Sequence, residues 1–108
     1  MTDEDFEMHV LANLDKAEQS IGYHFKGIRE LIAQHGAVAT AKMLVDVNMV
    51  LNIHSGFRVL EAADLEHLSI EQAVVDYADS GLFTPAEIAT AKARLIVTAN
   101  RKKRERQS

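Results

Sequence analysis

Histidines and carboxylates are the residues of this 108-residue chain that could bind a metal ion. No two of the five histidines have the i, i+4 spacing, with a Glu between them, that zinc hydrolases use on a helix. Asp64, Glu66 and His67 lie close in sequence, but they would bind a metal only if another segment added ligands. Asp46 and Asn48 supply too few oxygen ligands for a calcium loop. We therefore expect surface histidines and no metal site.

Motifs for nucleophilic catalysis and phosphate binding are also weak. The chain has no Cys, which excludes disulfides, thiolate metal sites and a cysteine nucleophile. His54 precedes Ser55 and Gly56, but a nucleophile needs a base that is close in space, not merely adjacent in sequence. We interpret these residues as a turn in which Ser55 caps the next helix. No glycine-rich phosphate loop occurs. The sequence thus predicts a protein that is not an enzyme and that has no cofactor.

Charge divides the chain into an acidic body and a basic end. Residues 1–100 carry 15 acidic and 7 basic side chains, whereas residues 101–108 carry five basic and one acidic side chain. An acidic body repels nucleic acid, because phosphate contacts supply most non-specific affinity. The basic tail is either a solvated helix end or a contact for an anionic partner such as nucleic acid. Its cations are Arg101, Lys102, Lys103, Arg104 and Arg106.

The elements that position these side chains are predicted to be helices. The chain has one Pro and five Gly, and apolar residues near its N-terminus recur with a period of about 3.7. Gly22 interrupts this pattern, so residues 3–35 form either one long helix that tolerates the glycine or two helices over 3–20 and 23–35, and we prefer the second interpretation. The apolar side chains of Phe6, Met8 and Leu11 either join the protein's own core or form an interface with a partner or a second copy in a homodimer.

Further helix boundaries follow from glycines and capping residues. Gly36 is expected to end one helix, and a short helix follows over 37–47. Residues 48–52 either prolong that helix or form a buried turn. A loop at 54–56 then precedes a short helix over 57–63.

The last third of the chain has two capping boxes. Ser69 with Gln72 starts a helix that Gly81 ends, and Thr84 with Glu87 starts the final helix. That helix has an apolar side. Its members are Ile88, Ala91, Leu95 and Ile96.

The segment from Ile28 to Leu44 has the outline of a helix-turn-helix. Its second helix would start with Ala37, Val38, Ala39 and Thr40, and Lys42 is its one basic residue. These side chains are poor at contacting base edges or phosphates. We favour a hairpin of two helices whose alanines allow close packing.

Residues 23–95 resemble a small helical module found in many uncharacterised bacterial proteins. The resemblance is carried by Gly56-Phe57-Arg58-Val59-Leu60 and Leu82-Phe83-Thr84-Pro85-Ala86-Glu87-Ile88, with Ala41-Lys42-Met43-Leu44 before them. The chain departs from that pattern at Phe25, where Pro is common, and at Leu65-Glu66-His67-Leu68. The resemblance implies an all-helical fold and no known activity, so it assigns no catalytic residue.

The sequence therefore predicts an all-α, single compact domain of five or six helices over residues 1–100, followed by the tail at 101–108. We expect a small cytoplasmic interaction or regulatory protein of a bacterium or phage that binds another protein. Nucleic-acid binding through the tail is the alternative, and no segment is apolar enough to span a membrane. The predicted core is Phe25, Ile28, Leu31, Leu44, Phe57, Leu60, Val74, Leu82, Phe83, Ile88 and Leu95.

Overall fold

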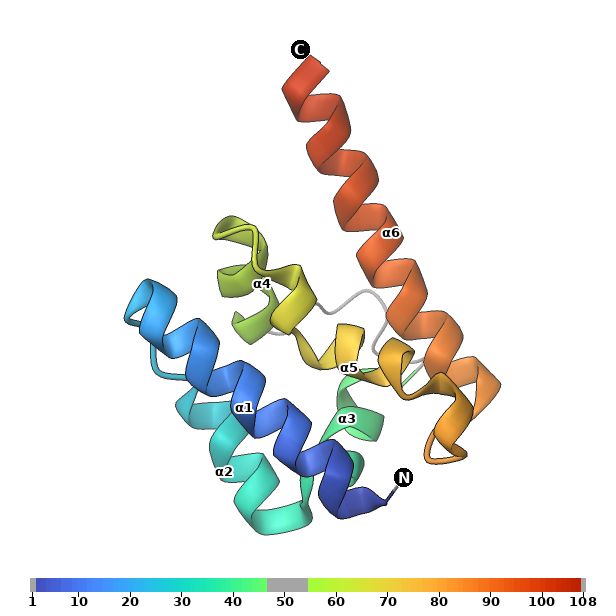
Figure 1. Ribbon diagram of the computed structural model, residues 1–108. Coiled ribbons are helices and arrows are strands. Elements are labelled where there is room, and N and C mark those ends of the chain that lie inside the picture. Colours follow the sequence, from blue (N-terminus) through green and yellow to red (C-terminus); the bar gives the residue numbers. More distant parts are fainter. Residues whose placement is uncertain (1, 47–54, 108) are drawn as a thin grey trace.

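Six α-helices occur in residues 2–46 and 55–107, the part of the chain that the computed structural model describes (Figure 1). They are α1 (Asp3–Ile21), α2 (Lys26–His35), α3 (Ala37–Leu44), α4 (Ser55–Ala62), α5 (Ile70–Asp76) and α6 (Pro85–Gln107). Two short 3-10 helices are η2 (Glu66–Leu68) and η3 (Ala78–Ser80). These residues contain no strand, and the predicted all-α fold is confirmed.

The first two helices are separate, as predicted. Thr2 caps α1 by accepting a hydrogen bond from the backbone N–H of Asp5, and the Asp5 carboxylate accepts one from the Thr2 N–H. Gly22 ends α1 with a φ of 69°, a left-handed conformation that glycine adopts without steric cost. The helices span 3–21 and 26–35, close to the expected 3–20 and 23–35.

Glu18 organises the turn between α1 and α2. Its carboxylate pairs with the Arg29 guanidinium and accepts a hydrogen bond of 3.1 Å from the Phe25 N–H. Arg29 also donates to Asp15 at 2.7 Å. The hydrogen bond from Arg29, with a further one from the Phe25 backbone, lowers the pKa of Glu18 below its ordinary value of 4.5. The ionised carboxylate therefore stabilises the pairing of the two helices.

This pairing makes stability depend on acid in a defined pH window. The folded protein lowers the pKa of Glu18 below 4.5. The stabilisation from the ionised carboxylate is therefore complete above pH 4.5, and it is lost as the pH falls through the pKa of Glu18 in the folded protein. We expect Glu18→Gln to cost about 1–2 kcal/mol at neutral pH, measured by urea unfolding, and progressively less in acid. Glu30→Gln is the matched control, because Glu30 is exposed on α2. Identical unfolding curves for the two variants at neutral pH would contradict this role of Glu18.

The junction of α2 and α3 is a tight hairpin. Gly36 ends α2 as predicted, with a φ of 87°. Glu7 of α1 accepts a hydrogen bond of 3.0 Å from the backbone N–H of Ala37, the first residue of α3. Ala37 and Ala41 are buried. The start of α3 is thus packed inside the protein, which favours the hairpin of closely packed helices over a DNA-recognition helix.

The middle of the chain differs from its predicted boundaries. Helix α3 ends at Leu44, with Val45 as its C-cap, where a helix to residue 47 was expected. The expectations for 48–52 and for His54 lie outside the described residues. Helix α4 begins at Ser55, so Ser55 and Gly56 are helical, and the expected start at residue 57 after a loop is wrong.

The boundaries of α5 are only partly as predicted. The Ser69 hydroxyl accepts a hydrogen bond from the Gln72 N–H, but the Gln72 side chain donates to Asp76 and does not complete a capping box. Helix α5 ends at Asp76, earlier than expected, because the chain tightens into η3 before Gly81 adopts a left-handed φ of 84°.

The start of α6 is as predicted. The Thr84 hydroxyl accepts from the Glu87 N–H, and the Glu87 carboxylate accepts from the Thr84 N–H. Pro85 is the first helical residue, where its missing N–H has no cost. Lys42 donates to Glu87 at 2.9 Å and joins α3 to α6. The backbone hydrogen bond from Thr84 and the bond from Lys42 outweigh the effect of burial and lower the pKa of Glu87.

The core lies among α1, α3, α5 and the segment before α6. Phe6 is fully buried, and its ring meets the Tyr77 and Phe83 rings edge-on at centroid distances of 5.3 and 5.0 Å. Five predicted core residues are buried, namely Phe25, Phe57, Leu60, Val74 and Phe83. The other six are partly buried: Ile28, Leu31, Leu44, Leu82, Ile88 and Leu95. Helix α6 packs mainly on α5, and its C-terminal end extends beyond the body (Figure 1).

Candidate functional site

The expected N-terminal interface is mostly core. Phe6 is 0% exposed and is not available to a partner, and Leu11 is partly buried and packs against the core cluster. Met8 is 71% exposed and is the one residue of the three that projects into solvent. The proposed interface of Phe6, Met8 and Leu11 is therefore corrected: the apolar side of α1 is covered by this protein's own helices.

The basic end of the chain is a continuation of α6 up to Gln107. Arg101 pairs with Glu61, and Lys102 donates to Asp64 and to the Glu61 carbonyl oxygen, each at 2.6 Å. Lys102 also pairs with Glu66. These five residues form an ionic cluster between α6 and the segment that runs from α4 to η2. Two of the five tail cations are thus held by the protein itself, so the expected solvated helix end applies only to part of the tail.

The electrostatics of the ionic cluster favour its charged state. Burial alone would lower the pKa of Lys102, but its bonds to Asp64 and Glu66 outweigh burial and raise the pKa. Asp64 has a φ of 59°, a left-handed conformation that is uncommon outside glycine. This conformation lies in the turn that follows α4. Lys102, which contacts three acceptors, therefore links α6 to the segment from α4 to η2.

The last turns of α6 carry the remaining tail cations. Lys103 and Arg104 are exposed, while the side chain of Arg106 lies outside the described residues. The Thr98 hydroxyl, two turns or less before them, donates to Glu61 at 3.1 Å. The ionic cluster and Thr98 therefore fix the inner side of this helix end, and Lys103 and Arg104 project from the other side.

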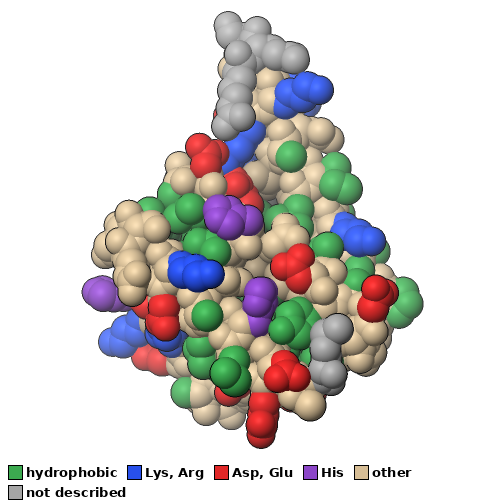
Figure 2. Space-filling view, viewed as in Figure 1, with side chains coloured by type: hydrophobic (Ala, Val, Ile, Leu, Met, Phe, Trp, Pro, Cys, Tyr) green, Lys and Arg blue, Asp and Glu red, His purple; other side chains and the backbone are tan. Residues whose placement is uncertain are grey.

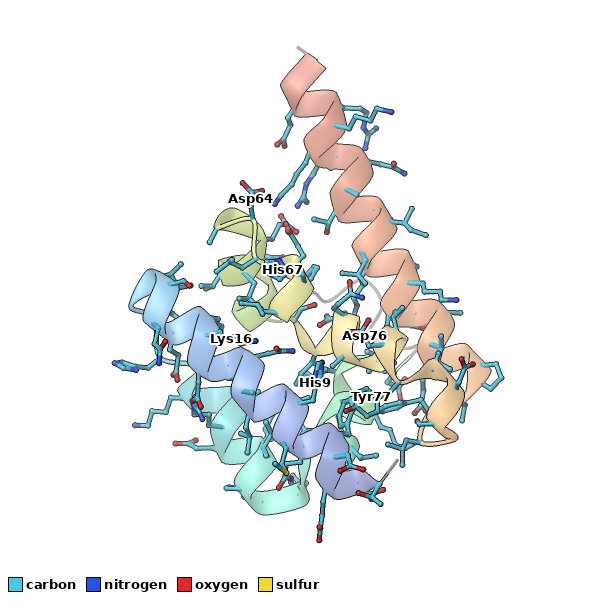
Figure 3. All side chains as sticks on the ribbon, in the orientation of Figure 1. His9, Lys16, Asp64, His67, Asp76 and Tyr77 are labelled. Atoms are coloured by element: carbon cyan, nitrogen blue, oxygen red, sulfur yellow. The ribbon has the colours of Figure 1, made fainter. Side chains whose placement is uncertain are left out.

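Asp64, Glu66 and His67, which are close in sequence, do not form a common site with the other histidines and carboxylates in the described part of the chain. Glu66 is engaged with Lys102, and His67 is exposed. Figure 3 shows His9, Asp76 and Tyr77 close together, where His9 Nε2 lies 3.8 Å from Asp76 and 3.3 Å from Asn13. Within residues 2–46 and 55–107, no group of three or more His, Asp or Glu side chains has the geometry to hold a metal ion.

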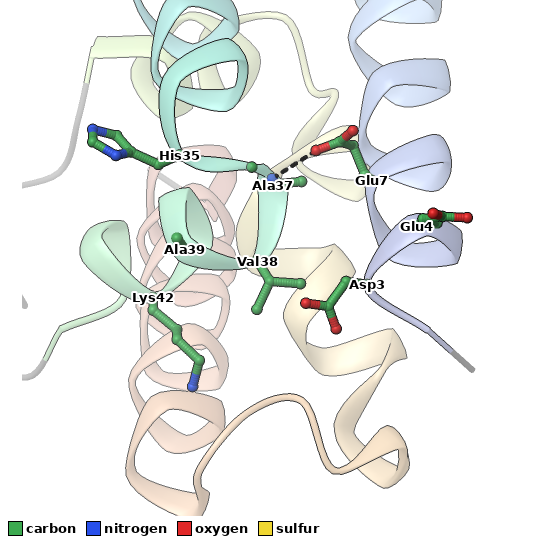
Figure 4. Close-up of a pocket in the computed structure, with 9 residues that line it drawn as sticks. Asp3, Glu4, Glu7, His35, Ala37, Val38, Ala39 and Lys42 are labelled. Atoms are coloured by element: carbon green, nitrogen blue, oxygen red, sulfur yellow. Dashed lines mark hydrogen bonds between the residues drawn. The ribbon is translucent and has the colours of Figure 1, made fainter.

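A hollow of about 330 Å³ lies between the start of α1 and the start of α3. Glu7, which lines it, is bound to the Ala37 N–H. Figure 4 shows Glu4 and His35 pointing away from one another, so the titratable groups around the hollow do not meet at one point. We assign this hollow no chemistry.

A buried ion pair, which sequence reasoning missed, fixes α6 on α5. Glu71 and Arg94 have side chains that are 0% and 2% exposed, and Arg94 Nη1 lies 3.0 Å from Glu71 Oε2. Thr90 and Thr98, also on α6, are buried on the same side of the helix. A charged pair shielded from water demands an accurate fit. It therefore holds the position and rotation of α6.

The opposite side of α6 is solvent-exposed along its length. We call it the outward face; its exposed members are Ala86, Ala89, Lys92, Ala93, Ile96, Val97, Ala99, Asn100, Lys103 and Arg104. Ile96 and Val97 are each 58% exposed whereas Ala91 is fully buried, so the prediction that Ile96 and Ala91 share one side of the helix is wrong. At 3.6 residues per turn, Ile96 lies about 100° around the helix from Leu95, enough to turn it out to solvent. Figure 2 shows hydrophobic and basic side chains along the upper right-hand edge of α6.

Comparison with known proteins gives no relative. No protein-family model, no curated protein and no solved structure matches this chain. The resemblance to a bacterial helical module therefore stays a prediction. Among the helices in the described part of the chain, none is both long and apolar enough to cross a membrane.

Proposed function

We propose that this chain is a small, non-catalytic interaction protein of the cytoplasm that binds another protein through the outward face of α6. The observation that carries the proposal is the pair Ile96 and Val97, adjacent large apolar side chains that are each 58% exposed. Alanines extend the apolar surface toward the start of α6. Apolar residues that gather on one exposed helix face favour contact with another apolar surface, because contact removes them from water.

The anchoring of α6 supports this proposal. The Glu71–Arg94 pair fixes the middle of the helix, and Lys102 fixes its end through the ionic cluster. A face held rigidly before binding loses little conformational entropy when a partner docks. The lack of cysteine in the chain is compatible with a reducing compartment.

Nucleic-acid binding by the tail is less well supported than protein binding. Arg101 and Lys102 are occupied by carboxylates of the same chain. Phosphate binding gains its free energy from cations that release counterions, so each internally paired cation weakens it. Protein binding uses the apolar residues that nucleic acid would leave exposed.

The proposal is tested by changing the apolar pair while leaving charge unchanged. We expect the double variant Ile96→Ser, Val97→Ser to retain its fold. The amount of partner that it captures from lysate should be at least about tenfold lower than the amount captured by the wild-type protein. The measurement is quantitative mass spectrometry of proteins bound to the immobilised chain.

Met8→Ser is the matched control, because Met8 is also a large exposed apolar residue but lies on α1. The control should capture the same partner as wild type. Capture that survives in the α6 variant, or that is lost only with Met8→Ser, would show that the outward face is not the binding surface.

A further inference from the structure

The outward face of α6 has a charge opposite to that of the rest of the chain. Its charged residues are Lys92, Lys103 and Arg104, and it includes no carboxylate. The acidic residues of α6 lie elsewhere: Glu87 is bound to Lys42, and Glu105 lies on the side of Arg101 and Lys102. By contrast, the whole chain has a formal net charge of −4. The charged residues on the same face as the exposed apolar pair are thus all positive.

The three cations bracket the apolar pair along the helix. With a rise of 1.5 Å per residue, Lys92 lies about 6 Å before Ile96, and Lys103 lies about 10 Å after it. Lys92, Lys103 and Arg104 form no ion pair with any residue in the described part of the chain. A helix that lies across this face would therefore meet an apolar centre with cations toward both ends.

From this arrangement, and resting on the proposed function, we propose that the occupant of the outward face is an acidic amphipathic helix of another protein. Its apolar side contacts Ile96 and Val97, and carboxylates that flank this side approach Lys92, Lys103 and Arg104. Complementary charge of this kind sets the choice and orientation of the partner. Two copies of the face would bring like charges together. Nucleic acid would leave the apolar pair without an apolar contact.

The test uses a displayed library of helical peptides. Residues are randomised on the side of the peptide helix that would contact Ile96 and Val97 and at the positions that flank this side. Selection on the wild-type protein should enrich peptides with Asp or Glu at the flanks, and these peptides should fail to bind Ile96→Ser, Val97→Ser. Enrichment of neutral or basic flanks, or no enrichment, would overturn the inference. If neutral-flanked peptides still require Ile96 and Val97, the proposed function stands while the acidic partner is rejected.

Charge reversal gives an independent readout on the selected acidic peptides. We expect Lys103→Glu, Arg104→Glu to weaken their binding at least about tenfold at low salt, measured by fluorescence anisotropy. The control is Lys16→Glu, Lys26→Glu, which changes net charge equally at exposed positions of α1 and α2 and should change binding about twofold at most. Equal weakening by both pairs would overturn the inference. So would tighter binding of a 20-base-pair duplex than of the peptides.

Discussion

Replacing Arg94 with Met is expected to lower the free energy of unfolding by about 3–5 kcal/mol. The Arg94 guanidinium lies 3.0 Å from the Glu71 carboxylate, and both side chains are almost completely shielded from water. Removal of the cation leaves a carboxylate in a site where water cannot readily replace its partner. Urea unfolding followed by circular dichroism measures the effect, with the midpoint shifting and the slope unchanged.

The double variant Glu71→Leu, Arg94→Met separates charge from packing. Because it removes both ions and fills the space with apolar atoms, it should recover at least about 2 kcal/mol relative to Arg94→Met alone. A single variant that loses less than about 1 kcal/mol would contradict the buried pair. If the stability lost by the double variant equals the sum of the losses of the two single variants, the two side chains act independently.

Local signals made most helix boundaries predictable. Thr84 with Glu87, and the stop at Gly36, involve residues within a few positions of one another, whereas Gly81 ends η3 and not α5 as expected. Their hydrogen bonds and backbone angles depend little on distant parts of the chain. The prediction of Gln72 as a capping partner was wrong because the Ser69 N–H, from which the Gln72 side-chain oxygen would accept, already donates to the Glu66 carbonyl oxygen at 3.0 Å.

Contacts between distant segments could not be predicted in the same way. Glu71 was interpreted only as part of a helix start, and nothing in its local sequence pairs it with Arg94, 23 residues away. Likewise, a run of basic residues indicates a charged tail. The ion pairs of Lys102 with Asp64 and Glu66 could not be predicted, because folding brings these residues together. The apolar period of α1 identified a buried side but not what covers it.

The candidate binding face depended on a small difference in helix rotation. Ile96 was grouped with Leu95 on one side of the helix because both are apolar. Arg94 and Thr98, which are polar by type, occupy the inner side instead, because Glu71 and Glu61 supply their partners. This arrangement turns Ile96 and Val97 toward solvent. The sequence therefore predicted the helix but assigned one of its key apolar residues to the wrong side.

The burial of Phe6 distinguishes a core role of α1 from a role in an interface. Phe6→Ala is expected to cost about 3–5 kcal/mol, because the Phe6 ring is fully buried against the rings of Tyr77 and Phe83. Met8→Ala, on the same helix, should change stability by about 0.5 kcal/mol or less, since Met8 is 71% exposed.

Protein concentration distinguishes a core role for Phe6 from a role in a dimer. If Phe6 is buried by its own chain, the unfolding midpoint of the wild-type protein is independent of concentration, and Phe6→Ala loses stability equally at every concentration. Burial in a dimer would instead make the wild-type midpoint rise with concentration, because association stabilises the folded state by mass action. A loss below about 1 kcal/mol for Phe6→Ala, or a midpoint that depends on concentration and loses that dependence in the variant, would place Phe6 outside the core of the single chain.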